Sequence, residues 1–302
     1  MDLKQLEYFV QVAELGSYTR AANRLAVVQS ALSRQVRSLE IELRQALFIR
    51  TGRGVTLTDA GRRLLEHGRG ILQQVQRARE DIESRRGEAG GRVVIGLPPS
   101  IGRTLTGPLV KAFRARLPNA TLSVVEGLSN YVLEWLAVGR VDCAVVYNVA
   151  PSPAVDLQPV LDERLYLVSA RTEPGKGRLV GASIPLAEVA EHELVIPSQP
   201  HSVRMLLEAA LAAEGRKPRV GLEIESVPAI LELVQHDGLH AVLALNAIET
   251  SGSASAFRAR PIGPPRLKTT LWIATSAQRP RGPLLDATAA LLRELLLADR
   301  PS

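Results

Sequence analysis

The sequence changes character at the glycine-rich segment Gly87-Glu-Ala-Gly-Gly91, and this change excludes a single uniform domain. Upstream, apolar residues recur at helical spacing and predict helices over 3–15 and about 18–26, a third that starts near Gln29, and a fourth from 59 to about 86. Downstream, strands and helices are predicted to alternate over 92–97, 102–117, 121–126, 129–139 and 142–147. This βαβαβ order predicts a parallel sheet with right-handed crossovers. Further strands are predicted at 165–169, 193–196, 220–225, 241–244 and 267–275, with helices at 202–214, 227–236 and 284–297.

The third predicted helix has two distinct faces. Its apolar stripe is Leu32, Val36, Leu39 and Leu43, and its polar face carries Gln29, Ser30, Ser33, Arg34 and Arg37. Two short helices joined by a tight turn, the second with hydrogen-bonding side chains, are typical of a helix-turn-helix. Residues 47–58 then predict a hairpin around Thr-Gly-Arg-Gly, with Arg53 at its tip, so the hairpin is interpreted as a wing.

The fourth predicted helix is long, and Thr58 is expected to cap its start. At 1.5 Å per residue it would extend roughly 40 Å. Its apolar residues recur at alternating steps of three and four, which favours pairing with a second copy: Leu64, Gly68, Ile71, Val75, Ala78 and Ile82. The alternative is that this face packs on the helix's own domain.

The positive charge is concentrated near the N-terminus. The chain has 37 basic and 31 acidic residues, a net charge of +6. Residues 18–63 hold nine arginines against three acidic residues, which equals the whole excess. Charge gathered on a helix-turn-helix and wing predicts DNA binding.

The sequence also favours a cytoplasmic location. The one cysteine, Cys143, lies in an apolar run, where we expect a buried strand residue, and it permits no intramolecular disulfide. No apolar stretch reaches the ~18 residues that span a membrane, and the N-terminus does not resemble a signal peptide.

Three dense runs resemble one known family. Residues 6–25, 29–40 and 47–61 are similar to the N-terminal domain of LysR-type transcription regulators. Downstream, Phe113…Pro118 and 133–142 resemble that family's effector domain, while His201-Ser-Val-Arg204 and 225–234 resemble its nitrogen-assimilation-control branch. The resemblance implies a multidomain fold: an all-α winged helix-turn-helix, a long linker helix, and an α/β effector domain of two subdomains, similar to periplasmic binding proteins.

The domain boundaries expected from this resemblance follow the predicted elements. Residues 1–58 form the winged helix-turn-helix, and 59–91 form the linker helix and hinge. Effector subdomain I comprises 92–162 and 267–302, and subdomain II comprises 163–266. The implied partners are double-stranded DNA with a partly palindromic A·T-rich site, RNA polymerase, a small-molecule effector and further copies of the chain, as a homodimer through the linker and a homotetramer. No cofactor is expected.

Specific roles at DNA follow from side-chain chemistry. Gln29 suits adenine and Arg34 suits guanine, while Ser33 can bond to a base or a phosphate. Arg37 is expected at phosphate and Arg53 in a narrow minor groove. Arg50 either contacts DNA or anchors the wing. The complete expected set is Tyr18, Thr19, Gln29, Ser30, Ser33, Arg34, Arg37, Arg50 and Arg53.

The two ends of the recognition helix depart from the family pattern. Val28 and Ser30 replace the serine and proline of a frequent Ser-Gln-Pro start to the recognition helix, so a side-chain cap is lost. Arg44 stands where glycine is common, at a place that favours positive φ.

The expected effector residues cluster at helix starts. Ser100, Ser129 and Ser202 follow strands or precede helices, where free N–H groups favour an anion, and Arg204 is close by. The alternative is that these serines only cap helices. The complete expected set is Ser100, Ile101, Ser129, Tyr147, His201, Ser202, Arg204 and Val227.

Two other function classes are the alternatives to an effector-responsive regulator. An enzyme is disfavoured, because the sequence has no glycine-rich phosphate loop and no Gly-x-Ser-x-Gly motif. His236 and His240 are separated by Gly238, which indicates a helix end rather than a metal site, so no metal is expected. The second alternative is an architectural DNA-binding protein that responds to no ligand.

Overall fold

The computed structural model describes residues 1–52, 54–83, 91–171, 178–279 and 281–298. Its N-terminal unit consists of α1 (Leu3–Leu15), α2 (Tyr18–Arg24), α3 (Gln29–Leu43) and an antiparallel hairpin of β1 (Phe48–Thr51) and β2 (Gly54–Leu57). Asp2 and Gln5 form a capping box at the start of α1, and Ser17 caps α2. The predicted helix-turn-helix and wing are therefore confirmed.

Both departures around α3 have the expected local effect. Val28 occupies the N-cap without a side-chain hydrogen bond, so α3 begins uncapped. Arg44 follows the helix in the left-handed conformation, with φ of 53°. A side chain other than glycine meets a steric penalty in that region.

The linker helix α4 (Asp59–Glu83) packs on its own N-terminal unit. Thr58 caps it, because its hydroxyl accepts the Gly61 N–H at 3.0 Å and donates to the Ala46 carbonyl. A Cβ atom on Gly68 would lie 3.1 Å from side-chain atoms of Leu6 and Val10. The start of the predicted pairing seam thus packs against α1 of the same chain, whereas the side chain of Ile71 remains 37% exposed. The Ile82 side chain lies outside the described residues.

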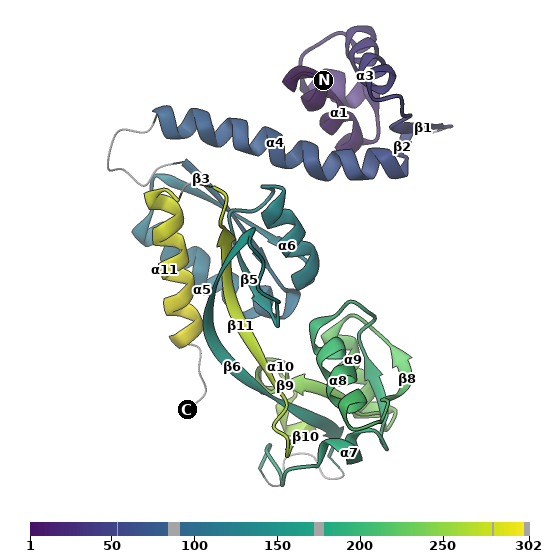
Figure 1. Ribbon diagram of the computed structural model, residues 1–302, viewed down its shortest axis with the longest axis vertical. Coiled ribbons are helices and arrows are strands. Elements are labelled where there is room, and N and C mark those ends of the chain that lie inside the picture. The colour runs from purple at the N-terminus through teal and green to yellow at the C-terminus, as the bar shows by residue number, and fades with distance from the viewer. Residues whose placement is uncertain (53, 84–90, 172–177, 280, 299–302) are drawn as a thin grey trace.

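Effector subdomain I is a mixed sheet between two helical layers (Figure 1). The strands lie in the order β4 (Ala120–Glu126), β3 (Gly91–Leu97), β5 (Cys143–Tyr147), β11 (Lys268–Ser276) and β6 (Val155–Ala170). The predicted parallel pairing holds for β4, β3 and β5, whereas β11 runs antiparallel to both of its neighbours, β5 and β6. Helices α5 (Pro99–Arg116) and α11 (Pro283–Ala298) cover one face, and α6 (Ser129–Ala137) covers the other.

One long strand connects the two subdomains. From Val155 to Arg164, β6 pairs with β11, and from Leu165 onward it pairs with β9 (Ala241–Ala244) and β10 (Phe257–Pro261). Figure 1 shows β6 and β11 passing side by side from one subdomain toward the other. The first ten residues of β6, and all of β10, were not predicted from the sequence.

Subdomain II builds its own cores around the far end of β6. It adds a parallel pair, β7 (Glu193–Ile196) and β8 (Arg219–Glu223), and the helices α8 (Ser202–Ala213) and α9 (Val227–His236). Shorter elements complete it: α7 (Leu186–Val189), α10 (Leu245–Glu249) and the 3₁₀ turn η1 (Ala254–Ala256). Within the part of the chain that the structure describes, no helix is long and apolar enough to span a membrane.

Candidate DNA-binding surface and effector cleft

The polar face of α3 lies opposite its buried stripe, as predicted. Leu32, Val36 and Leu39 are fully buried beneath it. Because successive helical residues turn by about 100°, the opposite side presents one continuous polar strip, exposed except for a half-buried serine at its centre: Gln29, Ser30, Ser33, Arg34 and Arg37. Among the described residues, neither Arg34 nor Arg37 has a hydrogen-bonding or ion-pair partner, so both guanidinium groups are available to a ligand.

The wing is held against this helix by an acidic side chain. Glu40 Oε1 accepts the backbone N–H groups of Leu47 at 2.8 Å and Phe48 at 3.2 Å. This carboxylate therefore serves the connection between α3 and β1. Its two bonds fix where the hairpin leaves the recognition helix.

The wing side chains differ in their surroundings. Arg50 is exposed on β1 and makes no hydrogen bond or ion pair with any described residue, which favours a contact outside the chain over an internal anchor. The Tyr18 ring packs against Phe48 with centroids 5.8 Å apart. Burial raises the pKa of Tyr18 to about 12, so its hydroxyl stays neutral. Thr19 is exposed in the first turn of α2, and Arg53 lies outside the described residues.

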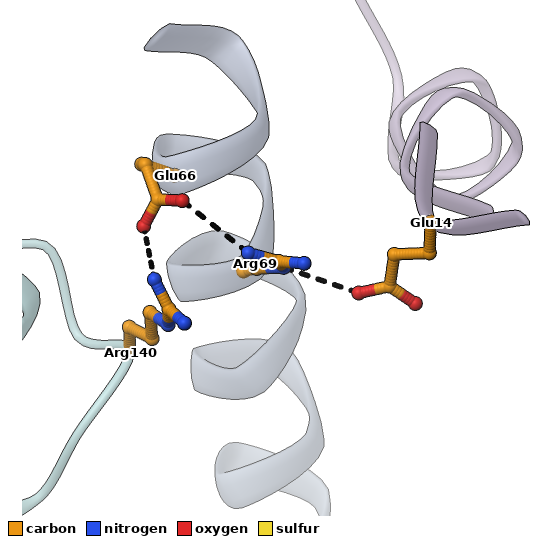
Figure 2. A network of polar contacts seen from close by, with 4 residues as sticks. All are labelled: Glu14, Glu66, Arg69 and Arg140. Atoms are coloured by element: carbon orange, nitrogen blue, oxygen red, sulfur yellow. Dashed lines mark hydrogen bonds and ion pairs between the residues drawn. The ribbon is translucent and has the colours of Figure 1, made fainter. Parts of the chain in front are cut away.

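A chain of charged side chains connects the effector domain with the N-terminal unit (Figure 2). Arg140, in the turn between α6 and β5, lies 2.5 Å from Glu66 of α4. Glu66 also pairs with Arg69 at 3.3 Å, and Arg69 reaches Glu14 of α1 at 3.1 Å. The guanidinium of Arg140 stacks over the Trp135 ring at 4.0 Å. The linker helix is thus tied to both domains.

Glycine permits the close contact between the linker and the effector domain. Gly70 is buried in α4, and a Cβ atom there would lie 1.8 Å from the Val138 carbonyl oxygen. No side chain fits at that distance, so this contact requires glycine. Gly68 on the same helix faces α1, so α4 is approached closely by both domains.

A cleft of about 520 Å³ lies between the two effector subdomains. Its walls include the first turns of α5 and α6 from subdomain I and of α8 and α9 from subdomain II. Contacts between the subdomains include a hydrogen bond from Arg103 to the Thr250 carbonyl at 2.7 Å, and Asn130 Nδ2 lies 3.5 Å from the Pro200 carbonyl oxygen. The subdomains therefore contact each other at the cleft.

Six of the predicted effector residues line this cleft: Ser100, Ser129, Tyr147, His201, Ser202 and Val227. Ile101 does not, because its side chain is 3% exposed and packs in the core of subdomain I. Arg204 does not either, since its guanidinium binds Glu208, Glu223 and the Pro197 carbonyl. Its i,i+4 spacing to Glu208 was a signal for that internal pairing.

The sequence did not point to the polar floor of the cleft. Glu163 of β6 accepts hydrogen bonds from Tyr147 Oη at 3.2 Å and Asn246 Nδ2 at 3.3 Å. Burial and the neighbouring Glu163 raise the pKa of Tyr147 well above its usual range, so its hydroxyl remains a neutral donor. Ser129 Oγ accepts the Tyr147 backbone N–H at 3.0 Å, which ties α6 to the end of β5.

Two further groups limit the chemistry of which the effector domain is capable. Burial lowers the pKa of His201, whose Nδ1 accepts the Val203 N–H at 3.3 Å, so its imidazole is neutral near pH 7. Cys143 is fully buried, as predicted, and burial raises the pKa of its thiol to about 12, which excludes a reactive thiolate. Among the residues that the structure describes, no group of His, Cys, Asp and Glu side chains could hold a metal ion.

The comparisons with known proteins agree with this architecture. Residues 3–62 match the family described as bacterial regulatory helix-turn-helix protein, lysR family, and residues 86–297 match the LysR substrate binding domain. The nitrogen assimilation regulatory protein nac of Klebsiella aerogenes is 34% identical over 304 residues, covering 100% of this chain and 97% of the relative.

Solved structures of full-length proteins share the fold. A full-length OxyR variant from Pseudomonas aeruginosa has a TM-score of 0.69 at 23% identity, covering 98% of this chain and 94% of that chain. CbnR, a LysR family transcriptional regulator, also has a TM-score of 0.69, at 24% identity with 98% and 99% coverage.

The winged helix-turn-helix, the long helix and the two α/β subdomains, together with the two family matches, define a DNA-binding transcription regulator with a substrate-binding type of domain. Together, the two domain families match nearly the whole chain. A relative above 30% identity also matches over the whole chain. The chain belongs to the LysR family of transcription regulators.

Proposed function

We propose that this regulator reads a partly palindromic, A·T-rich promoter site with α3 in the major groove and the wing on the adjacent minor groove. The observation that carries the proposal is the polar strip of α3, where the exposed Arg34 and Arg37 make no hydrogen bond or ion pair with any described residue. A helix of this kind fits the major groove, which displays a distinct pattern for each base pair.

Some of these side chains are proposed to recognise bases, and others to position the protein on the DNA backbone. Gln29 and Arg34 can make bidentate bonds to adenine and guanine, and Ser30 and Ser33 flank them on the same strip. Arg37 suits phosphate oxygens. The exposed Thr19 and the neutral Tyr18 hydroxyl, at the start of α2, suit the sugar-phosphate backbone as well. On the wing, Arg50 supports minor-groove or phosphate contact, with Arg53 predicted at the tip.

The regulator is proposed to work as a homodimer through the linker helix, and as a homotetramer formed from two dimers. Ile71 and Val75 of α4 remain for pairing after Leu64 and Gly68 have packed on α1. A two-fold dimer suits half-sites about 34–36 Å apart. The same assembly would contact RNA polymerase at a promoter in the cytoplasm.

A small molecule, and no cofactor, is proposed to occupy the cleft between the subdomains. The cleft volume, and a largely apolar lining that includes a few polar side chains, suit a compact effector with polar groups. Binding alters regulation only if the effector prefers one arrangement of the subdomains and linker over another.

The test of the DNA-binding proposal compares affinities for a promoter fragment and a scrambled fragment by fluorescence anisotropy. Arg34→Ala is expected to lose about 1–3 kcal/mol on the promoter fragment and less on the scrambled one. Arg37→Ala is expected to weaken binding to both and to lower the salt dependence. Arg114→Ala removes an exposed arginine of α5 and serves as the matched control. Equal behaviour of Arg34→Ala and Arg114→Ala would overturn the proposal.

A further inference from the structure

The charge of the cleft lining is predominantly negative. Three carboxylates line it, from Glu126, Glu163 and Glu225, against the single guanidinium of Arg103 among the described lining residues. His201 adds no positive charge near pH 7, because burial lowers its pKa. A ligand that carries only negative charge would meet unfavourable repulsion from this lining.

The floor of the cleft contains a buried hydroxyl that needs a partner. Thr269 is 1% exposed, lines the cleft, and its Oγ1 has no hydrogen-bond partner within the described chain. Thr269 of β11 is the cross-strand partner of Glu163 on β6, so both side chains lie on the same face of the sheet. A buried polar atom of this kind is stabilised when a bound molecule supplies the missing hydrogen bond.

The carboxylate beside that hydroxyl is held in a fixed position. Tyr147 and Asn246 donate to its two oxygens, one each, and both donors are neutral. An ionised carboxylate only accepts hydrogen bonds, at about four lone-pair sites on its two oxygens. An ammonium group has three donors and no acceptor, so it matches Glu163 and the Thr269 hydroxyl together.

The end of the cleft near α6 and α8 favours the opposite charge. The N-termini of these helices come from different subdomains and lie close together, since Asn130 Nδ2 of α6 lies 3.5 Å from the Pro200 carbonyl oxygen just before α8. Free N–H groups in first helical turns stabilise an anion. Ser129 and Ser202 lie at these two starts. A carboxylate placed between them would bind both subdomains at once.

We infer that the effector is a small zwitterion, whose ammonium group binds between Glu163 and Thr269 and whose carboxylate binds between the first turns of α6 and α8. The inference rests on the proposed role of the cleft and names the class of its ligand. It also explains why carboxylates and helix N-termini line the same cleft: the carboxylates bind the positive end of the ligand, and the helix N-termini bind its negative end.

The experiment uses the purified full-length protein and probes matched by carbon skeleton. The probes are the common amino acids and 4-aminobutyrate, together with the corresponding acids that lack the amino group and amines that lack the carboxylate. Thermal shift identifies binders, and titration calorimetry measures their affinity. At least one amino acid is expected to raise the Tm, while its matched acid and amine bind at least about tenfold more weakly.

Variants connect the binding to the floor residues. Glu163→Gln keeps the shape and the acceptor oxygen but removes the charge, and it is expected to weaken amino-acid binding at least about tenfold. Thr269→Val keeps the shape, removes the unpartnered hydroxyl, and should weaken binding independently if Glu163→Gln fails to fold. Glu134→Gln, on an exposed position of α6 outside the cleft lining, is the charge-matched control and should bind normally.

Several results would overturn the inference: binding of acids alone, binding of no probe, or unchanged binding by both floor variants. DNA binding is measured on the same preparations. If the wild-type protein binds promoter DNA but no amino acid, only the proposed ligand class is contradicted. If the wild-type protein does not bind promoter DNA, the proposed function itself is contradicted.

Discussion

Arg140 of the effector domain forms an ion pair with Glu66 of the linker helix, with 2.5 Å between Nη1 and Oε2. The same carboxylate contacts Arg69, which reaches Glu14 in α1. Figure 2 shows how these four side chains place the linker between the two domains. A movement of the α6–β5 turn therefore acts directly on the helix that carries the DNA-binding unit.

The strength of that ion pair can be measured with a double-mutant cycle. Glu66 and Arg140 side chains are 40% and 21% exposed, so solvent screens their attraction, and we expect a coupling of about 0.2–1 kcal/mol. The cycle combines Glu66→Gln and Arg140→Gln and measures unfolding in urea. Arg116 and Glu294, an exposed pair within subdomain I, provide the comparison. A coupling of zero would show that packing alone, and not charge, docks the linker.

Gly70→Ala tests the close contact between the linker and the effector domain. The added methyl group would meet the Val138 carbonyl oxygen, so α4 must move away from the α6–β5 turn. We expect a larger radius of gyration in small-angle X-ray scattering. Gly107→Ala, in an exposed and open part of α5, should leave the shape unchanged and raise stability by about 0.5–1 kcal/mol. Identical scattering by wild type and Gly70→Ala contradicts the docked arrangement.

Arg44→Gly is expected to stabilise the DNA-binding unit. The φ of 53° at Arg44 costs a side-chain-bearing residue about 1–2 kcal/mol. Glycine removes that cost, but it also increases the conformational entropy of the unfolded chain, which lowers the stability of the folded state by about 0.4–1 kcal/mol. The net gain in the free energy of unfolding should be up to about 1.5 kcal/mol in chemical denaturation. Gln35→Gly, at an exposed position within α3, should instead destabilise by about 1 kcal/mol.

Stability should fall in mild acid because of His201. Burial lowers its folded pKa below the ordinary 6.5, so under pH 6.5 the unfolded chain binds a proton that the folded chain resists. The stability that depends on a neutral His201 is therefore fully present above pH 6.5, and it is lost as the pH falls toward the pKa of His201 in the folded state. His201→Asn keeps a capping oxygen for the Val203 N–H and should reduce the loss between about pH 7.5 and 5.5. The exposed His236→Asn should not, and an equal change in both variants would contradict the assignment.

The N-terminal unit could be predicted well because its signals are local. Asp2, Ser17 and Thr58 cap helices that begin where the sequence indicated, and the stripe of Leu32, Val36 and Leu39 fixes which face of α3 is exposed. Even the unusual φ of Arg44 followed from its position after the helix.

The cleft could be predicted only in part, for a physical reason. Serines at helix starts are visible in sequence, but Glu163 and Thr269 meet only through cross-strand pairing between distant segments. Their strands also carry mixed polar and apolar residues, so the first half of β6 gave no clear period. The pairing seam was partly misassigned for a related reason: the spacing of Leu64 and Gly68 does not say whether the apolar face meets α1 or a second copy.

The most direct test of sequence-specific DNA recognition is a footprint of the purified protein on the DNA upstream of its own gene, at two salt concentrations. We expect a protected A·T-rich inverted repeat that weakens as salt rises, disappears with Arg34→Ala and persists with Arg114→Ala. Binding that is equally salt-sensitive but protects no defined sequence, in all three proteins, would contradict a sequence-reading regulator.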